Sequence, residues 1–487
     1  MSERKEPGIF GMFYSLRNNA HFRQALALIA IILVGLGFSL LPTPYGVSPK
    51  AYPTLGIFIS LIFGILLKPY PTVVLTLSGL FIAIIAGLVE PNEGFRCFGE
   101  SVLWLIAFAS IAAKSFVKTN LGERLACFFL KKTGKNSLSL AYGLVLSEVA
   151  LSPMIPSNTA RAACVSIPLA VSVSESLGSS PKDKTENLIG RFLNLCNMQA
   201  NQLTSALFLT SIGSNPVALN MMAKLGVSVS WGEWFFMACL PCGLCILAIP
   251  LLMYFLAPPE LKKIPQAVAI AQRRLDEMST MKPKEIITLC VFICMLLLWI
   301  FGDKLGLPTA VVALGGLCAL LITGVLSVDD ICGAKDIWNI LIWLAIFILL
   351  AGKLTEYGLV QYYSKILNGL LQGYSWQIAL FIVSGIYYCA RYVLPGNIMH
   401  ACAMFPAFAQ LLIACGVPAK MGCMMLAFIT AYCGYVTPYG SSPCPLTLNT
   451  GYIEQKLWWK VGAISGIFYF CIWYFVGRLW WKVTGYW

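Results

Sequence analysis

Charged side chains are scarce in this sequence of 487 residues. Only 11% of the residues are Asp, Glu, Lys or Arg, whereas 58% are hydrophobic, and the mean hydropathy is +0.78. An ordinary soluble domain is about 25% charged, because its surface faces water. The composition therefore excludes a water-soluble globular protein and predicts that lipid surrounds most of the chain.

The signatures of several enzyme classes are also missing. The chain has two histidines and contains no H-E-x-x-H, G-x-S-x-G or G-x-x-x-x-G-K-[ST] sequence. These motifs supply a zinc site, an activated serine and a phosphate-binding loop. We therefore expect neither an enzyme nor a cofactor, and we expect any transport to be driven by a gradient rather than by ATP.

The net charge of +13 does not indicate a nucleic-acid partner, because the basic residues lie in segments between apolar runs rather than in one basic domain. The positive-inside rule places two of these segments, 1–24 and 257–284, on the cytoplasmic side. The sequence thus predicts a cytoplasmic N-terminal segment (1–24), an N-terminal half (25–256), a cytoplasmic linker (257–284) and a C-terminal half (285–487).

Long uncharged apolar runs predict membrane-spanning helices, since about 20 helical residues cross the hydrocarbon core. Clear examples are Ala25 to Leu41, Ile286 to Phe301 and Pro308 to Val328. Two further segments, Ser101 to Val117 and Ile337 to Leu354, lead into a polar stop that contains glycine and then resume as a weaker helix. This pattern is typical of re-entrant hairpins, and a matching pair of them indicates a transporter.

Three short motifs recur in the same order in the two halves. The matching pairs are 119–122 with 355–358, 156–159 with 395–398, and 210–216 with 437–443. Their offsets are 236 (355 − 119), 239 (396 − 157) and 227 (437 − 210), so we predict two structural repeats. Whether the second repeat is inverted depends on the number of crossings between equivalent points, which the residues alone leave open.

The first proline-Asn turn, Pro153 to Thr159, places two prolines before three short polar residues. Such a helix break exposes backbone groups at mid-membrane. The amides that begin the next helix favour a carboxylate, whereas carbonyls and the oxygens of Ser157 and Asn158 suit a sodium ion. A structural kink capped by Ser157 is the alternative, but the recurrence around Asn397 favours a functional site.

The T-x-x-G-S-x-P segments support the same interpretation. Gly213 and Gly440 allow close backbone approach, and both lie inside long uncharged stretches, where polar groups must face protein or a cavity. Asn194, Asn197 and Asn201 share one helical face. Their stripe either lines a polar path or bonds neighbouring helices.

Ionisable residues inside apparent spans are costly and are therefore functional candidates. They are Lys114, Glu148, Arg161, Arg391 and His400. Arg161 either attracts an anion or holds the turn by bonding carbonyls, and we favour the second role. His400 either senses substrate protonation or is a bonded structural histidine, and again we favour the second.

The segment Pro156-Ser157-Asn158-Thr159-Ala160-Arg161 resembles the signature of the divalent anion/sodium symporter family, a Ser-Asn-Thr turn in each of two inverted repeats. The tail is similar to the branch that holds bacterial citrate/succinate and tartrate/succinate antiporters and the plastid 2-oxoglutarate/malate translocator. Its matching parts are Thr437-Pro438-Tyr439-Gly440, Gly451-Tyr452-Ile453, Trp458 and Gly462-Ala463-Ile464. The resemblance covers nearly the whole chain.

The resemblance implies an all-α polytopic membrane protein with about eleven transmembrane helices, two re-entrant hairpins and two inverted structural repeats. It also implies a homodimer with one site per protomer and elevator-type alternating access. Its surroundings would be membrane lipid, in a bacterial inner membrane or an organelle envelope.

The resemblance further assigns candidate site residues. Those implied for the carboxylate substrate are Ser157, Asn158, Thr159, Gly396, Asn397, Ile398, Thr437 and Pro438. Those implied for sodium are Ser157, Asn158, Gly213 and Asn397. Arg161 and His400 are additional candidates.

The second turn departs from the family pattern. Gly396 and Ile398 stand where serine and threonine are expected, which removes two hydroxyls. We expect a secondary transporter of di- or tricarboxylate anions, such as malate, succinate, 2-oxoglutarate or citrate, that works by anion exchange. Sodium-coupled symport of the same anions is the alternative, and the unusual turn also leaves another anion such as sulfate open.

Overall fold

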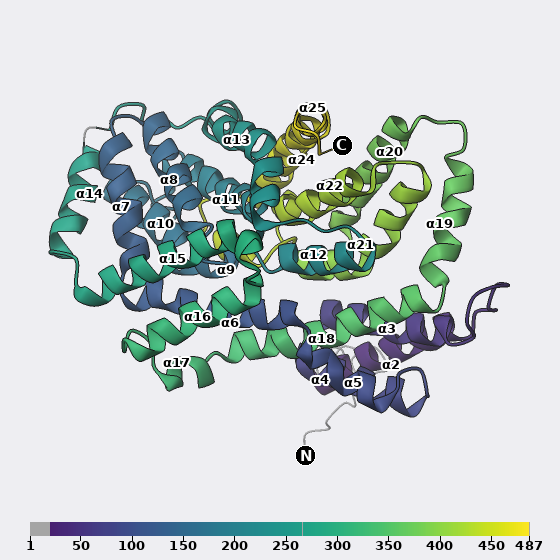
Figure 1. Cartoon of the computed structure of the whole chain (residues 1–487). Coiled ribbons are helices and arrows are strands. Elements are labelled where there is room, and N and C mark those ends of the chain that lie inside the picture. Colours follow the sequence, from purple (N-terminus) through teal and green to yellow (C-terminus); the bar gives the residue numbers. More distant parts are fainter. Residues whose placement is uncertain (1–19, 265, 487) are drawn as a thin grey trace, which may run out of the picture. The chain divides into compact units, whose positions relative to one another are not determined.

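The computed structural model describes residues 20–264 and 266–486, which leaves residues 1–19 of the predicted segment 1–24 outside the description. The described chain is helical almost throughout (Figure 1), and its β-type pairing is limited to an isolated bridge between Asn136 and Lys263. The predicted all-α fold is therefore confirmed. The chain forms two compact units, residues 1–103 with 338–363, and residues 104–337 with 364–487.

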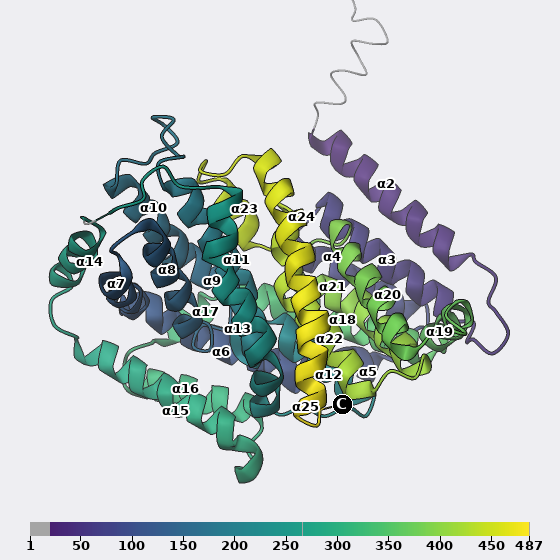
Figure 2. The same cartoon turned by 90° about the horizontal axis from the view of Figure 1, so that it is seen from above.

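The first unit contains the N-terminal helices and most of α18. Its elements are α2 (Ala20–Ser39), α3 (Ala51–Leu67), α4 (Thr72–Ile85), α5 (Pro91–Arg96) and residues 338–356 of α18 (Lys335–Glu356). α3 packs against both α2 and α4, and α2 lies alongside α3 in Figure 2. The ring of Phe58 on α3 lies 5.5 Å from that of Phe347 on α18, so an aromatic contact joins segments that are far apart in sequence.

The second unit is built around α11 (Gly190–Leu207), which is buried along nearly its whole length. The helices that pack against it are α8 (Ser137–Leu151), α10 (Ile167–Ser176), α13 (Trp231–Leu256) and α22 (Ala419–Tyr432), and Figure 2 shows α11 and α13 side by side. A helix that carries Asn, Gln and Thr can occupy this central position in a membrane protein only if its neighbours satisfy the polar groups.

The other helices of the chain complete the fold. They are α6 (Ser101–Lys118), α7 (Leu121–Thr133), α9 (Asn158–Arg161), α12 (Ser214–Lys224), α14 (Gln266–Glu277), α15 (Pro283–Leu305), α16 (Thr309–Ile322), α17 (Val328–Cys332), α19 (Leu359–Leu370), α20 (Trp376–Cys389), α21 (Asn397–Ala414), α23 (Pro443–Leu448), α24 (Gln455–Cys471) and α25 (Arg478–Val483). The predicted linker 257–284 contains α14, which packs against α7.

Eight stretches of the described residues are long and apolar enough to cross a membrane. They are His21–Ser39, Pro91–Lys118, Trp231–Leu256, Pro283–Gly302, Lys335–Glu356, Asn397–Ala414, Ala419–Val436 and Gln455–Val483. Four shorter apolar helices, α3, α4, α8 and α16, add to them. The multi-pass character is therefore confirmed, whereas the predicted number of about eleven spans stays a prediction.

The two segments predicted to be re-entrant hairpins form long uninterrupted helices, α6 and α18. Each helix is followed by a turn with one left-handed residue, Asn120 (φ 59°) or Gly358 (φ 81°), and then by α7 or α19. The polar stops are thus helix-to-helix turns, while their re-entrant character stays a prediction. The compact units draw on both halves of the sequence, so the predicted domain limits and the inverted repeats also stay predictions.

The contact between α2 and α3 depends on small residues and gives a first prediction. A β-carbon added to Gly56 would overlap the carbonyl oxygen of Gly35 and the hydroxyl of Ser39. Gly56→Leu should therefore lower the stability of the protein by about 1–3 kcal/mol, measured as a lower Tm in detergent. Gly37→Leu is the control, because a side chain there meets open space. Equal Tm values for both variants would show that the close contact does not matter.

Candidate functional site

The first turn lies between α8 and α9. Ser157 caps α9, because its Oγ accepts a hydrogen bond from the Ala160 amide at 3.2 Å. After α9 the chain makes one π-helical turn, Ala162–Ser166, before α10 begins. Asn158 is buried, whereas Ser157 and Thr159 on either side of it are partly exposed. The turn thus presents two hydroxyl-bearing residues and holds its asparagine inside the protein.

The second turn, between α20 and α21, has the same layout with different chemistry. Asn397 is buried, and its neighbours Gly396 and Ile398 are partly exposed. Gly396 has φ +80° and ψ 127°, a conformation that strains any residue with a β-carbon. Glycine adopts this backbone conformation readily, whereas the serine of the family pattern would be strained in it.

Both turns are hydrogen-bonded to the second T-x-x-G-S-x-P loop. The Nδ2 of Asn158 donates to the Oγ of Ser441 at 3.2 Å, and the Gly396 amide donates to the Gly440 carbonyl at 2.9 Å. A β-carbon on Gly434, just before this loop, would lie 2.5 Å from the Oε1 of Gln202 on α11. The structure therefore brings the two turns, α11 and this loop into one cluster.

The first T-x-x-G-S-x-P loop meets the second turn through apolar atoms. A β-carbon on Gly213 would lie 3.3 Å from the Cδ1 of Ile398 and 3.8 Å from the side chain of Ile106 on α6. A small apolar pocket adjoins this contact, lined by Ile106, Pro156, Ile212 and Gly213 among others. Glycine at 213 is what allows Ile398 to approach the loop so closely.

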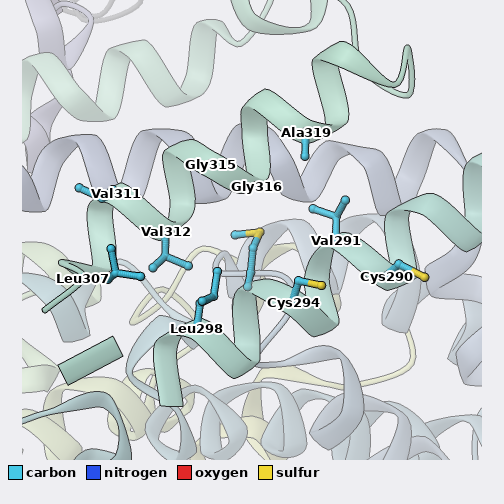
Figure 3. Close-up of a pocket in the computed structure, with 11 residues that line it drawn as sticks. Cys290, Val291, Cys294, Leu298, Leu307, Val311, Val312, Gly315, Gly316 and Ala319 are labelled. Carbon is cyan, nitrogen blue, oxygen red and sulfur yellow. The ribbon is translucent and has the colours of Figure 1, made fainter. Parts of the chain in front are cut away.

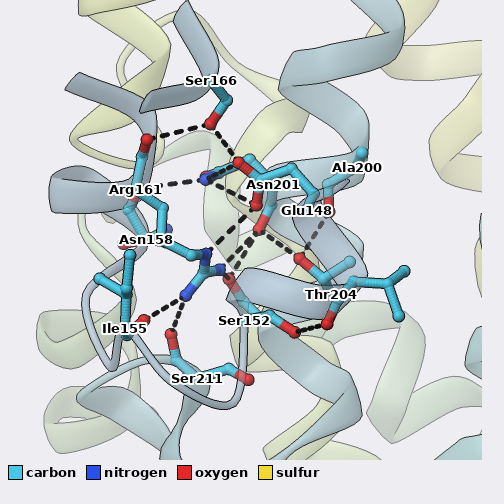
Figure 4. Close-up of polar contacts among 12 residues, drawn as sticks. Glu148, Ser152, Ile155, Asn158, Arg161, Ser166, Ala200, Asn201, Thr204 and Ser211 are labelled. Carbon is cyan, nitrogen blue, oxygen red and sulfur yellow. Dashed lines mark hydrogen bonds and ion pairs between the residues drawn. The ribbon is translucent and has the colours of Figure 1, made fainter. Parts of the chain in front are cut away.

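Arg161 ties the first turn to its surroundings (Figure 4). Its Nη1 donates to the carbonyls of Ile155 and Ser211, both at 2.7 Å, and its Nε lies 3.2 Å from the Oε2 of Glu148. Its Nη2 donates to the Oγ of Ser205 at 3.1 Å and to a carbonyl of α11 at 3.4 Å. All five N–H groups of the guanidinium are thus used, and none is left for a substrate anion.

Glu148 balances the charge of Arg161 in a fully buried position. Its carboxylate also accepts hydrogen bonds from the Oγ of Ser166 and the Nδ2 of Asn201. Asn201 donates in addition to the Asn158 carbonyl at 3.0 Å, so this member of the asparagine stripe bonds a neighbouring segment. Asn194 donates to the carbonyl of Gly190 four residues earlier on its own helix, at 2.9 Å.

Arg391 has the corresponding role at the second turn, without a carboxylate. It donates to the Gly396 carbonyl at 2.9 Å and to the Oδ1 of Asn397 at 2.6 Å. The Nδ2 of Asn397 donates to the carbonyls of Thr430 and Ala431 at 2.9 and 3.0 Å. Both ends of this amide are therefore engaged, and among the described residues no Asp or Glu pairs with the buried guanidinium.

Residues 22–487 match the family described as the sodium:sulfate symporter transmembrane region. The chain belongs to this family. It is 37% identical to YflS of Bacillus subtilis, provisionally named a malate transporter, over 95% of this chain and 97% of that protein. It is 36% identical to the chloroplast dicarboxylate transporter 1 of Spinacia oleracea, over 94% of this chain and 81% of that protein. The inner membrane protein YbhI of Escherichia coli is 31% identical, over 94% and 97%.

The family match confirms the resemblance to the divalent anion/sodium symporter family, and the named malate and dicarboxylate transporters agree with the branch that the tail resembles. The chain is therefore a multi-pass membrane transporter and not an enzyme, in agreement with relatives from a bacterial membrane and from chloroplasts. Because the family is named after sodium, we ask whether the oxygen atoms around each turn of this chain could bind that ion.

The first T-x-x-G-S-x-P loop, which is bonded to the first turn through Arg161, differs from the second turn in its fit to sodium. At the first loop, Ser211 Oγ, Ser214 Oγ and Asn215 Oδ1 are buried and have no hydrogen-bond partner among the described residues, and such oxygens suit a hard cation. At the second turn, the Gly396 carbonyl and the Asn397 Oδ1 already accept from Arg391. The first loop thus has oxygens free to bind a cation, whereas a cation at the second turn would compete with the guanidinium of Arg391.

The other candidate site residues from the sequence are Thr437, Pro438, His400 and Lys114. Thr437 and Pro438 are buried, and the Thr437 Oγ1 has no hydrogen-bond partner among the described residues. His400 is fully buried, with Nε2 3.0 Å from the Tyr387 carbonyl and Nδ1 3.5 Å from the Thr430 Oγ1, which agrees with a bonded structural histidine. Lys114 lies outside this site and donates to the Asp330 carbonyl at 3.2 Å.

The Arg161–Glu148 pair gives a second prediction. Glu148→Ala leaves the buried guanidinium without its counter-ion, which should cost about 3–5 kcal/mol of stability and lower the Tm in detergent markedly. The control is Glu454→Ala, because Glu454 is 69% exposed and its contact with Arg191 is long at 3.4 Å; its loss should cost at most about 1 kcal/mol. Similar Tm values for the two variants would contradict a structural role for the buried pair.

Proposed function

We propose that this protein is a dicarboxylate exchanger that works as a homodimer by elevator-type alternating access. Two chloroplast relatives with 36% and 34% identity are named dicarboxylate transporters. The site supports an anion of this kind, because Ser157 and Thr159 are partly exposed at the start of a helix, where hydroxyls and amides favour a carboxylate.

The observation that carries the proposal of exchange is the charge on Arg391. This guanidinium is buried and has no carboxylate partner among the described residues, whereas Arg161 is paired with Glu148. A fixed positive charge beside the site makes the empty site cationic, and moving an uncompensated charge through hydrocarbon is costly. One carboxylate group of the bound anion would supply the counter-charge that Arg391 lacks, so we expect a loaded site to move more readily than an empty one in both directions. This is the behaviour of an exchanger.

The second turn also favours dicarboxylates over citrate. Gly396 has no side chain and Ile398 presents only apolar atoms, so this turn has no hydroxyl that could bind a further carboxylate. Each unpaired polar group of a bound ligand costs affinity. We therefore propose the succinate, malate and 2-oxoglutarate class as cargo.

Sodium-coupled symport of the same anions is the second candidate. It is favoured by the three buried oxygens of Ser211, Ser214 and Asn215 that lack partners among the described residues. Oxygens of this kind are ligands that a hard cation prefers, so we place a coupling sodium ion at the first loop in this alternative. Such an ion would couple transport to the sodium gradient.

Uptake of labelled succinate into proteoliposomes tests these alternatives. We expect uptake when the vesicles contain unlabelled succinate or malate, and none when they are empty and only an inward sodium gradient is present. Uptake that requires sodium and no internal anion would establish symport instead. If neither condition gives uptake by folded protein, the dicarboxylate proposal is wrong.

Replacing the buried asparagine of the first turn gives a further prediction. Asn158→Ala removes the hydrogen bond to Ser441 and loosens the cluster that positions Ser157 and Thr159. If Ser157 and Thr159 are displaced, their hydrogen bonds to the carboxylate are weakened, and exchange should fall by about tenfold or more. The elution volume in size-exclusion chromatography should be unchanged. Asn449→Ala, at an exposed asparagine after α23, is the control. Normal exchange by Asn158→Ala would make the turn a structural kink.

A further inference from the structure

A cavity of about 500 Å³ lies between α15 and α16, outside the cluster formed by the two turns (Figure 3). It is lined by residues of α15 from Cys290 to Leu298, by residues of α16 from Val311 to Ala319, and by Leu307 between the helices. The lining side chains are aliphatic apart from Met295 and two cysteines. A carboxylate would find no partner there, so the ligand of this groove must be apolar.

Two adjacent glycines shape the floor of the groove. A β-carbon on Gly316 would overlap the side chain of Met295, whereas one on Gly315 would meet no atom within 4 Å. Gly316 thus allows the two helices to pack closely, and Gly315 leaves space unfilled. Gly315 is exposed and Gly316 is buried, so the space beside Gly315 is an open groove on the surface of the helix pair that a molecule from outside the chain can enter.

The groove lies between two helices whose apolar composition suits a membrane-spanning segment. Residues Pro283–Gly302 of α15 form one of the candidate spans, and α16 is one of the shorter apolar helices. The groove residues of α15 run from Cys290 to Leu298, eight residue steps apart (298 − 290), or about 12 Å of helix. This length is close to one leaflet of the hydrocarbon core, which is about 15 Å thick.

One positive charge lies at the end of the groove. Lys284 precedes Val291 by seven residues and Leu298 by fourteen, so it lies on the same face of α15, two turns before the groove begins. Lys284 is exposed and forms no ion pair with any described residue, while its neighbour Glu285 is paired with Arg124 at 2.6 Å. The positive-inside rule places this end at the cytoplasmic leaflet, where anionic lipids gather.

From these features we propose that the groove binds one acyl chain of an anionic phospholipid, whose phosphate lies at Lys284. The apolar lining receives the chain, and the unpaired ammonium receives the headgroup. A second copy of this protein would instead have to present an acidic residue at Lys284 and a ridge of side chains to the groove. The lipid satisfies both requirements without any further partner.

Photo-crosslinking of the full chain in proteoliposomes tests the proposal. The probes are phosphatidylglycerol and phosphatidylcholine that carry a diazirine in one acyl chain, and cross-links are mapped by mass spectrometry. We expect phosphatidylglycerol to label residues 290–319 more strongly than phosphatidylcholine does. Lys284→Ala should remove this preference. Equal labelling by both probes would overturn the assignment of the headgroup.

Filling the groove supplies the decisive variant. Gly315→Leu places a side chain in the open space without a clash, so labelling of residues 290–319 should be lost while the Tm is retained. Gly243→Leu on α13 is the matched control, since a β-carbon there also meets no atom within 4 Å, and it should retain the labelling. Undiminished labelling in Gly315→Leu would overturn the proposal. So would a change from dimer to monomer in this variant, which would identify the groove as a protein interface.

Discussion

The fully buried ion pair between Arg161 and Glu148 is the interaction on which the first turn depends. A helix that breaks at mid-membrane leaves carbonyls without partners, and water is not available to them. Arg161 satisfies the carbonyls of Ile155 and Ser211 at once and thereby fastens the turn to the first loop. Glu148 supplies the counter-charge for this guanidinium, which lowers the cost of burying it.

The second turn also uses a buried arginine to satisfy its backbone and side-chain oxygens, but its charge balance is different. Arg391 bonds the Gly396 carbonyl and the Asn397 side chain, so its donors hold the turn as those of Arg161 do. No carboxylate of the described residues neutralises it, and its Nε has no hydrogen-bond partner there. The two turns thus share an exposure pattern, with a buried asparagine between two partly exposed residues, but they differ in net charge. On this ground we propose that the hydroxyls of the first turn bind a carboxylate and that the anion compensates the charge at the second turn.

The sequence predicted the parts of this arrangement that depend on local chemistry. Uncharged apolar runs predicted the helices, and the two prolines predicted the break. The cap at Ser157 was part of the alternative interpretation of the turn as a structural kink, and the structure contains it. The sequence could not predict that Asn201 reaches the Asn158 carbonyl, or that Arg391 takes the side-chain oxygen of Asn397, since these bonds depend on how helices pack. Gly396 departs from the family pattern in the sequence itself, but its positive φ is visible only in the backbone.

The uncompensated charge of Arg391 also affects how the second turn would respond when an anion binds. The Asn397 amide is held at both ends by Arg391 and by the carbonyls of Thr430 and Ala431, so an arriving anion meets a turn that is already positioned. A preorganised charge needs little rearrangement when the ligand binds, and unlike a sodium ion it cannot dissociate with the ligand. In the proposed mechanism this positive charge remains when the anion is released, and a second anion would neutralise it. This permanence supports our proposal of coupling by exchange. Any sodium would then bind at the first loop, where the oxygens of Ser211, Ser214 and Asn215 are not already bound to a cation.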